Sequence, residues 1–343
     1  MTAWALLRHG PSRYYWCNRV IGVDPPASRE SGRAIGPHRG ETVRRAAGNV
    51  TIIAAILMQM TAKDRVPGLW MKMPVSLRAI VSGILIGLSA ANVWPLLLLN
   101  LGVPLAVITE AIFLALYLWW ASGGGPPSAT QAARTKAFRS GRLTPTQWFW
   151  GAIAALFFAA TVHASIVLLF RFVPFPRAAF RHGYDLSFIP SLGMKWLAVV
   201  VSAVSAGICE ETGFRGYMQR PIEQRHGAPV AILISSLFFM ALHLTKAWST
   251  PEMVPIVFGA GVLLGLLAWS SGSLIPAMIG HVVMDIGLFA YWWTGIAGDF
   301  TAQPIISTGV DQPFLIAGAA FTISLFMVLL AIAKLRGRGL STF

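Results

Sequence analysis

The feature that most constrains the fold is a series of apolar runs that fills the chain from about residue 78 onward. Each run is near the length of about 20 residues that a helix needs to cross the hydrocarbon core of a bilayer. Only 12% of all residues are charged, about half the share found in soluble domains. The sequence therefore predicts an all-α, polytopic membrane bundle of about eight transmembrane helices, at residues 79–99, 103–121, 148–173, 194–218, 228–246, 252–271, 273–295 and 313–334.

Residues 1–72 differ from the bundle, which we place at 73–343. Their first part is rich in Arg, Gly and Pro and has no clear period, and the stretch VTIIAAILMQMTA is too short to span. We interpret these residues as a basic, disordered extension, because such a composition buries little apolar surface. A second hypothesis is that the start was assigned too early and translation begins at Met58, Met60, Met71 or Met73.

The formal net charge of +14 would suggest nucleic-acid binding in a soluble protein. Here most Lys and Arg residues lie between the apolar runs, where they set the orientation of a membrane protein. We therefore predict no nucleic-acid partner. Four basic clusters fall on one side of an eight-span bundle, which places both termini in the cytosol; the clusters lie at 63–78, 134–142, 220–225 and 334–338. The Arg-, Ala- and Gly-rich composition favours a bacterial plasma (inner) membrane.

Acidic residues are scarce, thirteen in the whole chain, yet several ionisable residues fall inside predicted spans. A charge near the centre of a bilayer costs several kcal/mol, so such groups usually face a partner or a wet cavity. Each is therefore a candidate functional residue. The set comprises Glu110, His163, Glu210, Glu211, His243, His281 and Asp285.

Helical spacing separates the two adjacent acids. Glu211 and Arg215 are four residues apart and share one helix face, with the acid on the favourable N-terminal side. Glu210 points about 100° away from Glu211. We expect one acid to form a salt bridge and the other to face a site. Small residues at helical spacing from Glu210, among them Gly207 and Gly213, would let other helices approach closely.

Two further apolar segments carry polar groups suited to acid–base or metal chemistry, His243 in FMALH and the pair His281 and Asp285 in HVVMD. The ordered set EETGFR, FMALH and HVVMD resembles the E-E-x-x-x-R, F-x-x-x-H and H-x-x-x-N/D motifs of the CAAX protease and bacteriocin-processing family (CPBP, or Abi). This family includes the type II CAAX prenyl endopeptidases. The motif region covers about residues 194–290, and the catalytic residues that the resemblance implies are Glu210, Glu211, Arg215, His243, His281 and Asp285.

Two schemes of peptide hydrolysis fit these residues. In the first, Glu210 and His243 hold a water, Glu210 removes its proton, and His281 with Asp285 stabilises the oxyanion. In the second, that of a metalloprotease, Glu210, His243 and His281, with or without Asp285, ligate Zn²⁺ and leave one position for water. Asp285 stands where eukaryotic members carry Asn, and a carboxylate donates a hydrogen bond only when protonated. The sequence leaves the cofactor open between zinc and none.

The resemblance implies an intramembrane endopeptidase, a hydrolase whose substrate is a peptide in the lipid bilayer. That peptide would be lipid-modified, as in CAAX processing, or would carry a leader, as in bacteriocin maturation. The alternative is a non-catalytic membrane protein of the same fold, either a peptide-binding immunity protein or a proton-coupled transporter. The sequence specifies neither the individual substrate nor the oligomeric state.

Overall fold

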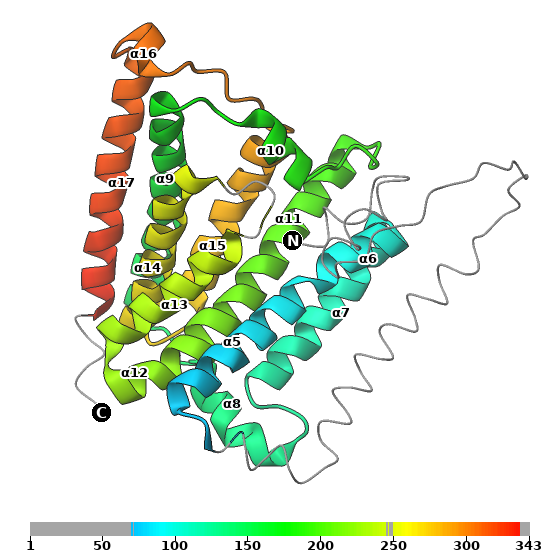
Figure 1. Cartoon of the computed structure of the whole chain (residues 1–343). Coiled ribbons are helices and arrows are strands. Elements are labelled where there is room, and N and C mark those ends of the chain that lie inside the picture. Colours follow the sequence, from blue (N-terminus) through cyan, green and yellow to red (C-terminus); the bar gives the residue numbers. More distant parts are fainter. Residues whose placement is uncertain (1–69, 71, 245, 247–249, 337–343) are drawn as a thin grey trace, which may run out of the picture. The chain divides into compact units, whose positions relative to one another are not determined.

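The computed structural model describes residues 70, 72–244, 246 and 250–336 (Figure 1). Apart from residues 70 and 72, the predicted extension, residues 1–72, lies outside this part, as do all of the alternative starts except Met73. The regular structure of the described residues is helical. Its helices are α5 (Val75–Ala91), α6 (Val93–Leu101), α7 (Val103–Ala121), α8 (Gln131–Ala137), α9 (Pro145–Phe172), α10 (Arg177–Gly183), α11 (Leu192–Glu211), α12 (Arg220–His226), α13 (Ala228–His243), α14 (Val254–Ser271), α15 (Ile275–Gly287), α16 (Ile305–Thr308) and α17 (Gln312–Arg336), with π-helical segments at Thr212–Gln219 and Leu288–Trp293.

Seven helical stretches of the described part are long and apolar enough to cross a membrane. They correspond to seven of the eight predicted spans, which confirms a polytopic helical bundle. The exception is the predicted span 228–246. It forms only the 16-residue helix α13, which begins after Gly227 and ends at His243. At 1.5 Å per residue α13 is about 24 Å long, less than the roughly 30 Å of a hydrocarbon core.

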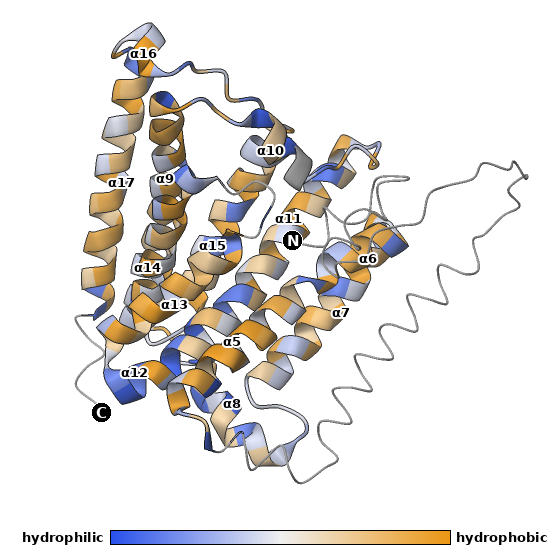
Figure 2. Cartoon of the chain, in the orientation of Figure 1, coloured by the Kyte–Doolittle hydropathy of each residue, from blue (hydrophilic) through white to orange (hydrophobic). Residues whose placement is uncertain are grey.

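The outer faces of the helices are apolar, as Figure 2 shows along α7 and α17. On α7 the exposed residues recur every three or four positions, so they form one stripe, while Ala106, Glu110 and Ala121 are buried on the opposite side. Water would strongly disfavour such a stripe, whereas lipid chains do not. The exposed stripe of α7 consists of Leu105, Ile108, Ile112, Leu116 and Trp119. This pattern is that of an integral membrane protein.

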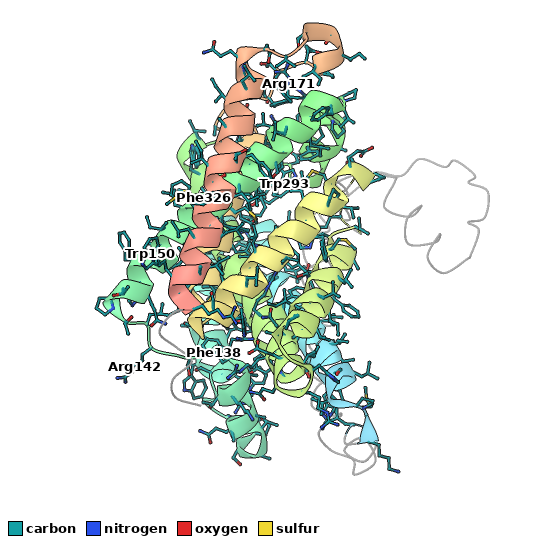
Figure 3. All side chains as sticks on the ribbon, turned by 90° about the vertical axis from the view of Figure 1, so that its left-hand side faces the viewer. Phe138, Arg142, Trp150, Arg171, Trp293 and Phe326 are labelled. Atoms are coloured by element: carbon teal, nitrogen blue, oxygen red, sulfur yellow. The ribbon has the colours of Figure 1, made fainter. Side chains whose placement is uncertain are left out.

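The helices that carry the predicted site residues pack on one another and, through α15, on α9. Both α15 and α17 lie along α9, α11 packs on α15, and α13 packs on α14. Figure 3 shows α17 in front of this group, with Phe326 on it and with Arg171 and Arg142 toward opposite ends. α13 also packs on the segment Thr212–Gln219 that follows α11, so α11, α13 and α15 belong to one group of packed helices.

Glycines allow two close helix approaches beside the acidic pair. A Cβ atom on Gly213 would lie 2.5 Å from the Gly83 carbonyl oxygen and 2.6 Å from the Gly87 Cα, so α5 crosses the segment after α11 backbone to backbone. A Cβ on Gly207 would lie 2.6 Å from a methyl group of Val282 on α15. Small residues at such crossings are typical of membrane bundles. Gly207 and Gly213 therefore bring neighbouring helices close, as their spacing predicted.

The two ends of the bundle carry different charged contacts. At the lower end in Figure 1, where α8 and α12 lie, Arg139 pairs with Glu223 and Arg336 stacks over Trp269 at 4.6 Å. At the opposite end, Arg171 binds Asp311 at 2.8 Å. Three of the predicted basic clusters thus lie at the end of the bundle that carries α8 and α12. Their described members fall at 134–142, 220–225 and 334–336. Which end faces the cytosol remains a prediction.

Candidate active site

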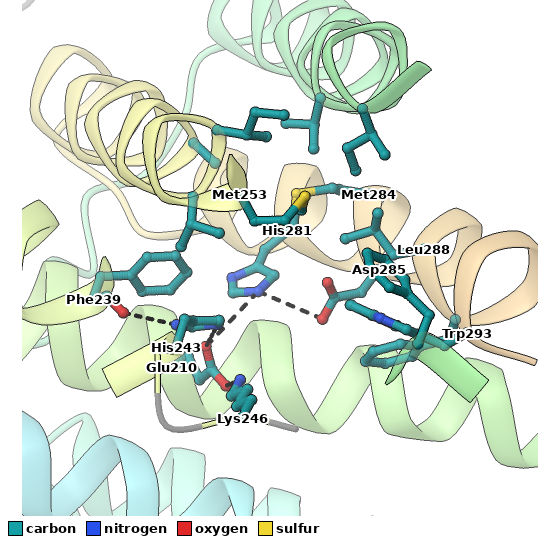
Figure 4. Close-up of a pocket in the computed structure, with 17 residues that line it drawn as sticks. Glu210, Phe239, His243, Lys246, Met253, His281, Met284, Asp285, Leu288 and Trp293 are labelled. Carbon is teal, nitrogen blue, oxygen red and sulfur yellow. Dashed lines mark hydrogen bonds and ion pairs between the residues drawn. The ribbon is translucent and has the colours of Figure 1, made fainter. Parts of the chain in front are cut away.

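Three elements position the predicted site residues around one cavity, shown in Figure 4. Glu210 and Glu211 are the last two residues of α11, and His243 is the last residue of α13. His281 and Asp285 lie one turn apart on α15. Glu210, His243, His281 and Asp285 all line the cavity. Glu211 and Arg215 lie behind it and do not line it.

Glu210 is the acid that faces the cavity, and it is 4% exposed. Its Oε2 atom lies 3.8 Å from His243 Nε2 and 4.0 Å from His281 Nε2. Its Oε1 atom lies 3.8 Å from the Lys246 ammonium. These spacings exceed that of a direct hydrogen bond, and they are of the size that a bridging water spans.

Glu211 is the acid that forms a salt bridge. Its Oε1 atom accepts from Arg215 Nη1 at 2.8 Å and lies 2.8 Å from His281 Nδ1. Arg215 is fully buried, donates from Nη2 to the Gly261 carbonyl at 3.0 Å and lies 4.5 Å from the centre of the Phe239 ring. Because Arg215 fixes Glu211 and Glu211 binds His281, the pair orients the ring of a residue that faces the cavity.

Both imidazoles present Nε2 to the cavity. His243 Nδ1 lies 2.7 Å from the Phe239 carbonyl, which can only accept, so Nδ1 carries the proton and donates. His281 Nδ1 likewise donates to Glu211. The Nε2 atom of His281 lies 3.5 Å from Asp285 Oδ2. The two rings therefore point their remaining nitrogen at the space next to Glu210.

The cavity has about 40 Å³ of internal space. A buried water needs roughly 10–15 Å³ and two to four polar partners, so the cavity is large enough for hydrolytic water. Apart from the polar groups above, its walls are apolar and come from α9, α14, α15 and the segments beside them. Examples are Val162, Met253, Ala260, Met284, Leu288 and Trp293.

A metal ion does not fit this arrangement. In the described part of the chain, no group of three or more His, Cys, Asp or Glu residues has the geometry to hold one. The four candidate ligands Glu210, His243, His281 and Asp285 surround the cavity, and the Lys246 ammonium lies 3.8 Å from Glu210 Oε1, so a metal ion bound by Glu210 would have a second cation beside it.

Two residues near the site were missed in the sequence. Lys246, three positions beyond the histidine of FMALH, lines the cavity. Arg139 is buried behind the π-helical segment, where its Nε donates to the Arg215 carbonyl at 3.1 Å and its Nη1 to the Ala268 carbonyl at 3.2 Å. Burial lowers the pKa of the Arg139 guanidinium, and the neighbouring Glu223 opposes this shift. No local sequence pattern distinguishes Arg139 from an ordinary basic loop residue.

The remaining ionisable residues of the spans lie outside the cavity lining. The ring of His163 accepts from Trp292 Nε1 at 3.1 Å and lies 3.3 Å from the Met284 carbonyl. Glu110 is fully buried on α7. Both residues therefore contribute to packing between helices and not to the polar cluster around Glu210.

Comparison with known families agrees with this geometry. Residues 192–287, a little over a quarter of the chain, match the family described as Type II CAAX prenyl endopeptidase Rce1-like. This segment contains all six predicted site residues. No match is found among curated proteins or among solved structures. Residues 192–287 are therefore similar to the Rce1-like type II CAAX prenyl endopeptidases, and this similarity is consistent with an intramembrane protease of the CPBP family.

Proposed function

We propose that the cavity hydrolyses a peptide bond of a membrane-associated, CAAX-type substrate with a water activated by Glu210 and His243. The observation that carries this proposal is the 3.8 Å gap between Glu210 Oε2 and His243 Nε2. A water at about 2.8 Å from both atoms fits this gap and donates one hydrogen bond to each. Glu210 is thus a general base within reach of the proton that it removes.

The reaction then follows from the same geometry. Glu210 takes a proton from the water while the water oxygen bonds to the scissile carbonyl carbon, and the carbonyl electron pair moves to its oxygen. His281 Nε2 donates to this oxyanion. Collapse of the intermediate breaks the C–N bond, and the proton held by Glu210 passes to the leaving nitrogen. No metal takes part in these steps.

The residues around His281 suit it for donation to an oxyanion. Its Nδ1 proton is bound to Glu211, so Nε2 donates only when the ring carries a second proton. The carboxylates of Glu211 and Asp285 lie 2.8 and 3.5 Å from the ring nitrogens and stabilise that positive charge. In this proposal Asp285 acts as an electrostatic partner of His281, a role that does not require it to donate a hydrogen bond.

The test is cleavage of a farnesylated, internally quenched CAAX-type peptide by the protein in proteoliposomes. Glu210→Gln keeps the size of the side chain but removes the base, so we expect the rate to fall by roughly 10²- to 10⁴-fold. Glu252→Gln is the matched control, because Glu252 is exposed and does not line the cavity. Full activity in Glu210→Gln would refute the mechanism.

A chelator separates the two chemical schemes. We expect cleavage to continue at the wild-type rate after dialysis against a strong chelator, with no stoichiometric metal in the purified protein. Loss of activity that added zinc restores would refute the metal-free scheme. Peptide binding without any hydrolysis by the wild type would favour the non-catalytic alternative.

We further propose that the basic end of the bundle faces the cytosol of a bacterial cell.

A further inference from the structure

Arg139 is a buried cation that the mechanism above does not use. Its side chain is only 1% exposed, although it follows α8 at the basic end of the bundle, and its backbone has a φ of 50°. A positive φ is unfavourable for a residue that carries a Cβ atom, and it persists only where surrounding contacts hold it. The contacts of Arg139 therefore indicate its role.

The guanidinium of Arg139 binds the π-helical segment Thr212–Gln219. Its Nε atom donates to the Arg215 carbonyl at 3.1 Å. The adjacent Phe214 carbonyl accepts from Ser235 Oγ on α13, also at 3.1 Å. A π-helix is rare, and two successive carbonyl groups of this one are bound by side chains from outside the segment. The position of the Arg215 backbone therefore depends on Arg139.

The same guanidinium also binds α14, the helix on which this segment packs. Three side chains donate to carbonyl groups that are four and three residues apart, and such spacing places them along one face of a helix. The three bonds are Arg215 Nη2 to Gly261 at 3.0 Å, Gln219 Nε2 to Gly265 at 3.0 Å and Arg139 Nη1 to Ala268 at 3.2 Å. Because Arg139 binds both α14 and the Arg215 carbonyl, it fixes where the π-helical segment lies on α14.

Arg215 in turn orients a residue of the cavity. Its Nη1 atom donates to Glu211 Oε1 at 2.8 Å, and the same oxygen accepts from His281 Nδ1 at 2.8 Å. Hydrogen bonds depend steeply on distance and angle, so a shift of Arg215 displaces Glu211 and turns the imidazole. We infer that Arg139 is a positioning residue of the active site, which acts through Arg215 and Glu211 to hold His281 Nε2 toward the reacting carbonyl. This inference rests on the proposed protease function.

The kinetic experiment compares two buried arginines. Arg139→Met removes the donor but leaves Glu223 paired with Arg220 at 2.8 Å, so no buried carboxylate is left alone. We expect kcat for the farnesylated, internally quenched peptide to fall roughly 10- to 100-fold, the effect of a small misplacement of a catalytic group. KM should stay within about twofold, because Arg139 lies behind the residues that line the cavity.

Arg134→Met is the matched control. Arg134 is buried on α8, but its hydrogen bonds go to the carbonyl groups of residues 120, 125 and 127 and not to the π-helical segment. Its loss should lower Tm, yet the folded protein should keep the wild-type kcat. Equal values of kcat in Arg139→Met and Arg134→Met would overturn the inference, as would a change confined to KM.

Arg139→Lys decides the question if Arg139→Met does not fold. Lysine keeps a positive charge beside Glu223, but it lacks the planar fork that reaches the Arg215 and Ala268 carbonyl groups together. We expect this variant to fold, with kcat below that of the wild type and an unchanged KM. A wild-type kcat in Arg139→Lys would overturn the inference.

NMR of ¹⁵N-labelled histidines in the full chain separates this inference from the protease function. The Nδ1 proton of His281, bound to Glu211, should exchange slowly with water in the wild type and in Arg134→Met, and faster in Arg139→Met. The Nδ1 proton of His243, bound to the Phe239 carbonyl, is the internal reference and should not respond.

The outcomes of the two experiments differ. If only the His281 proton responds to Arg139→Met and none of the proteins cleaves the peptide, the protease proposal fails and the positioning role of Arg139 stands. If the wild type cleaves the peptide but His281 exchanges equally slowly in Arg139→Met, the protease proposal stands and the inference is overturned. Faster exchange at both histidines would indicate a general loss of structure and would also overturn it.

Discussion

Replacing Gly213 by alanine tests the close crossing between α5 and the segment that follows α11. The new Cβ would lie 2.5 Å from the Gly83 carbonyl oxygen, and ordinary contact begins at 3.4 Å, so the two backbones must separate by the difference, about 0.9 Å. Overpacking of this kind costs about 1–3 kcal/mol, here toward the upper end because both obstructing atoms belong to backbone. The better helix propensity of alanine offsets at most about 1 kcal/mol of this loss of stability. We expect a net loss of about 1–2 kcal/mol.

The assay is thermal unfolding in detergent micelles, followed by the fluorescence of the 13 tryptophans. The expected loss corresponds to a fall in Tm of roughly 2–8 °C. Gly318→Ala is the matched control, because a Cβ on Gly318 meets nothing within 4 Å and the residue lies within α17. The control should be as stable as the wild type or slightly more stable. If the Tm of Gly213→Ala equals that of the Gly318→Ala control, the inferred backbone-to-backbone contact is refuted.

Two further predictions concern charged contacts. Arg215→Met should lower the free energy of unfolding by about 3–5 kcal/mol, because it leaves the buried Glu211 carboxylate unpaired. Adding Glu211→Gln to this variant should recover part of the loss. A loss below about 1 kcal/mol in Arg215→Met would contradict a buried ion pair. The hydrogen bond from Arg171 lowers the pKa of Asp311 below its ordinary value of 3.8. The pair therefore stabilises the fold above that pH and loses its effect as the pH falls through the lowered pKa, so Tm should fall more between pH 6 and pH 3 in the wild type than in Asp311→Asn.

The sequence predicted the spans well because length and apolarity decide whether a helix can cross a bilayer. It failed on α13 for a physical reason. The apolar run continues to about residue 246, yet the helix ends at His243. Hydropathy does not show whether an apolar helix crosses the bilayer or ends inside the protein, since irregular backbone is tolerated at membrane depth when protein surrounds it.

Part of the site also followed from local spacing. Four-residue intervals placed Glu211 beside Arg215 and His281 near Asp285, and both pairs are in contact in the structure. Long-range partners were beyond such reasoning. Arg139 binds carbonyl groups 76 and 129 residues further along the chain, so nothing near it in sequence indicates its burial.

Lys246 was missed for a different reason. It follows the end of α13, where helical periodicity no longer relates one residue to the next. Its position beside Glu210 depends on how the chain turns after His243. The sequence therefore indicated which acid and which imidazoles meet, and the structure was needed to find the cation beside them.

The π-helical segment Thr212–Gln219 joins two halves of one long helix and fixes how they are rotated relative to each other about the helix axis. Upstream lies Glu210, the acid that lines the cavity; at the end of the segment Gln219 donates to the Gly265 carbonyl at 3.0 Å, and beyond it Glu223 pairs with Arg139. Loss of a single residue from this segment would rotate everything after it by about 100° relative to Glu210. One half could then keep its partners only if the other lost them. Functional relatives should therefore align here without gaps, even where their loops differ in length.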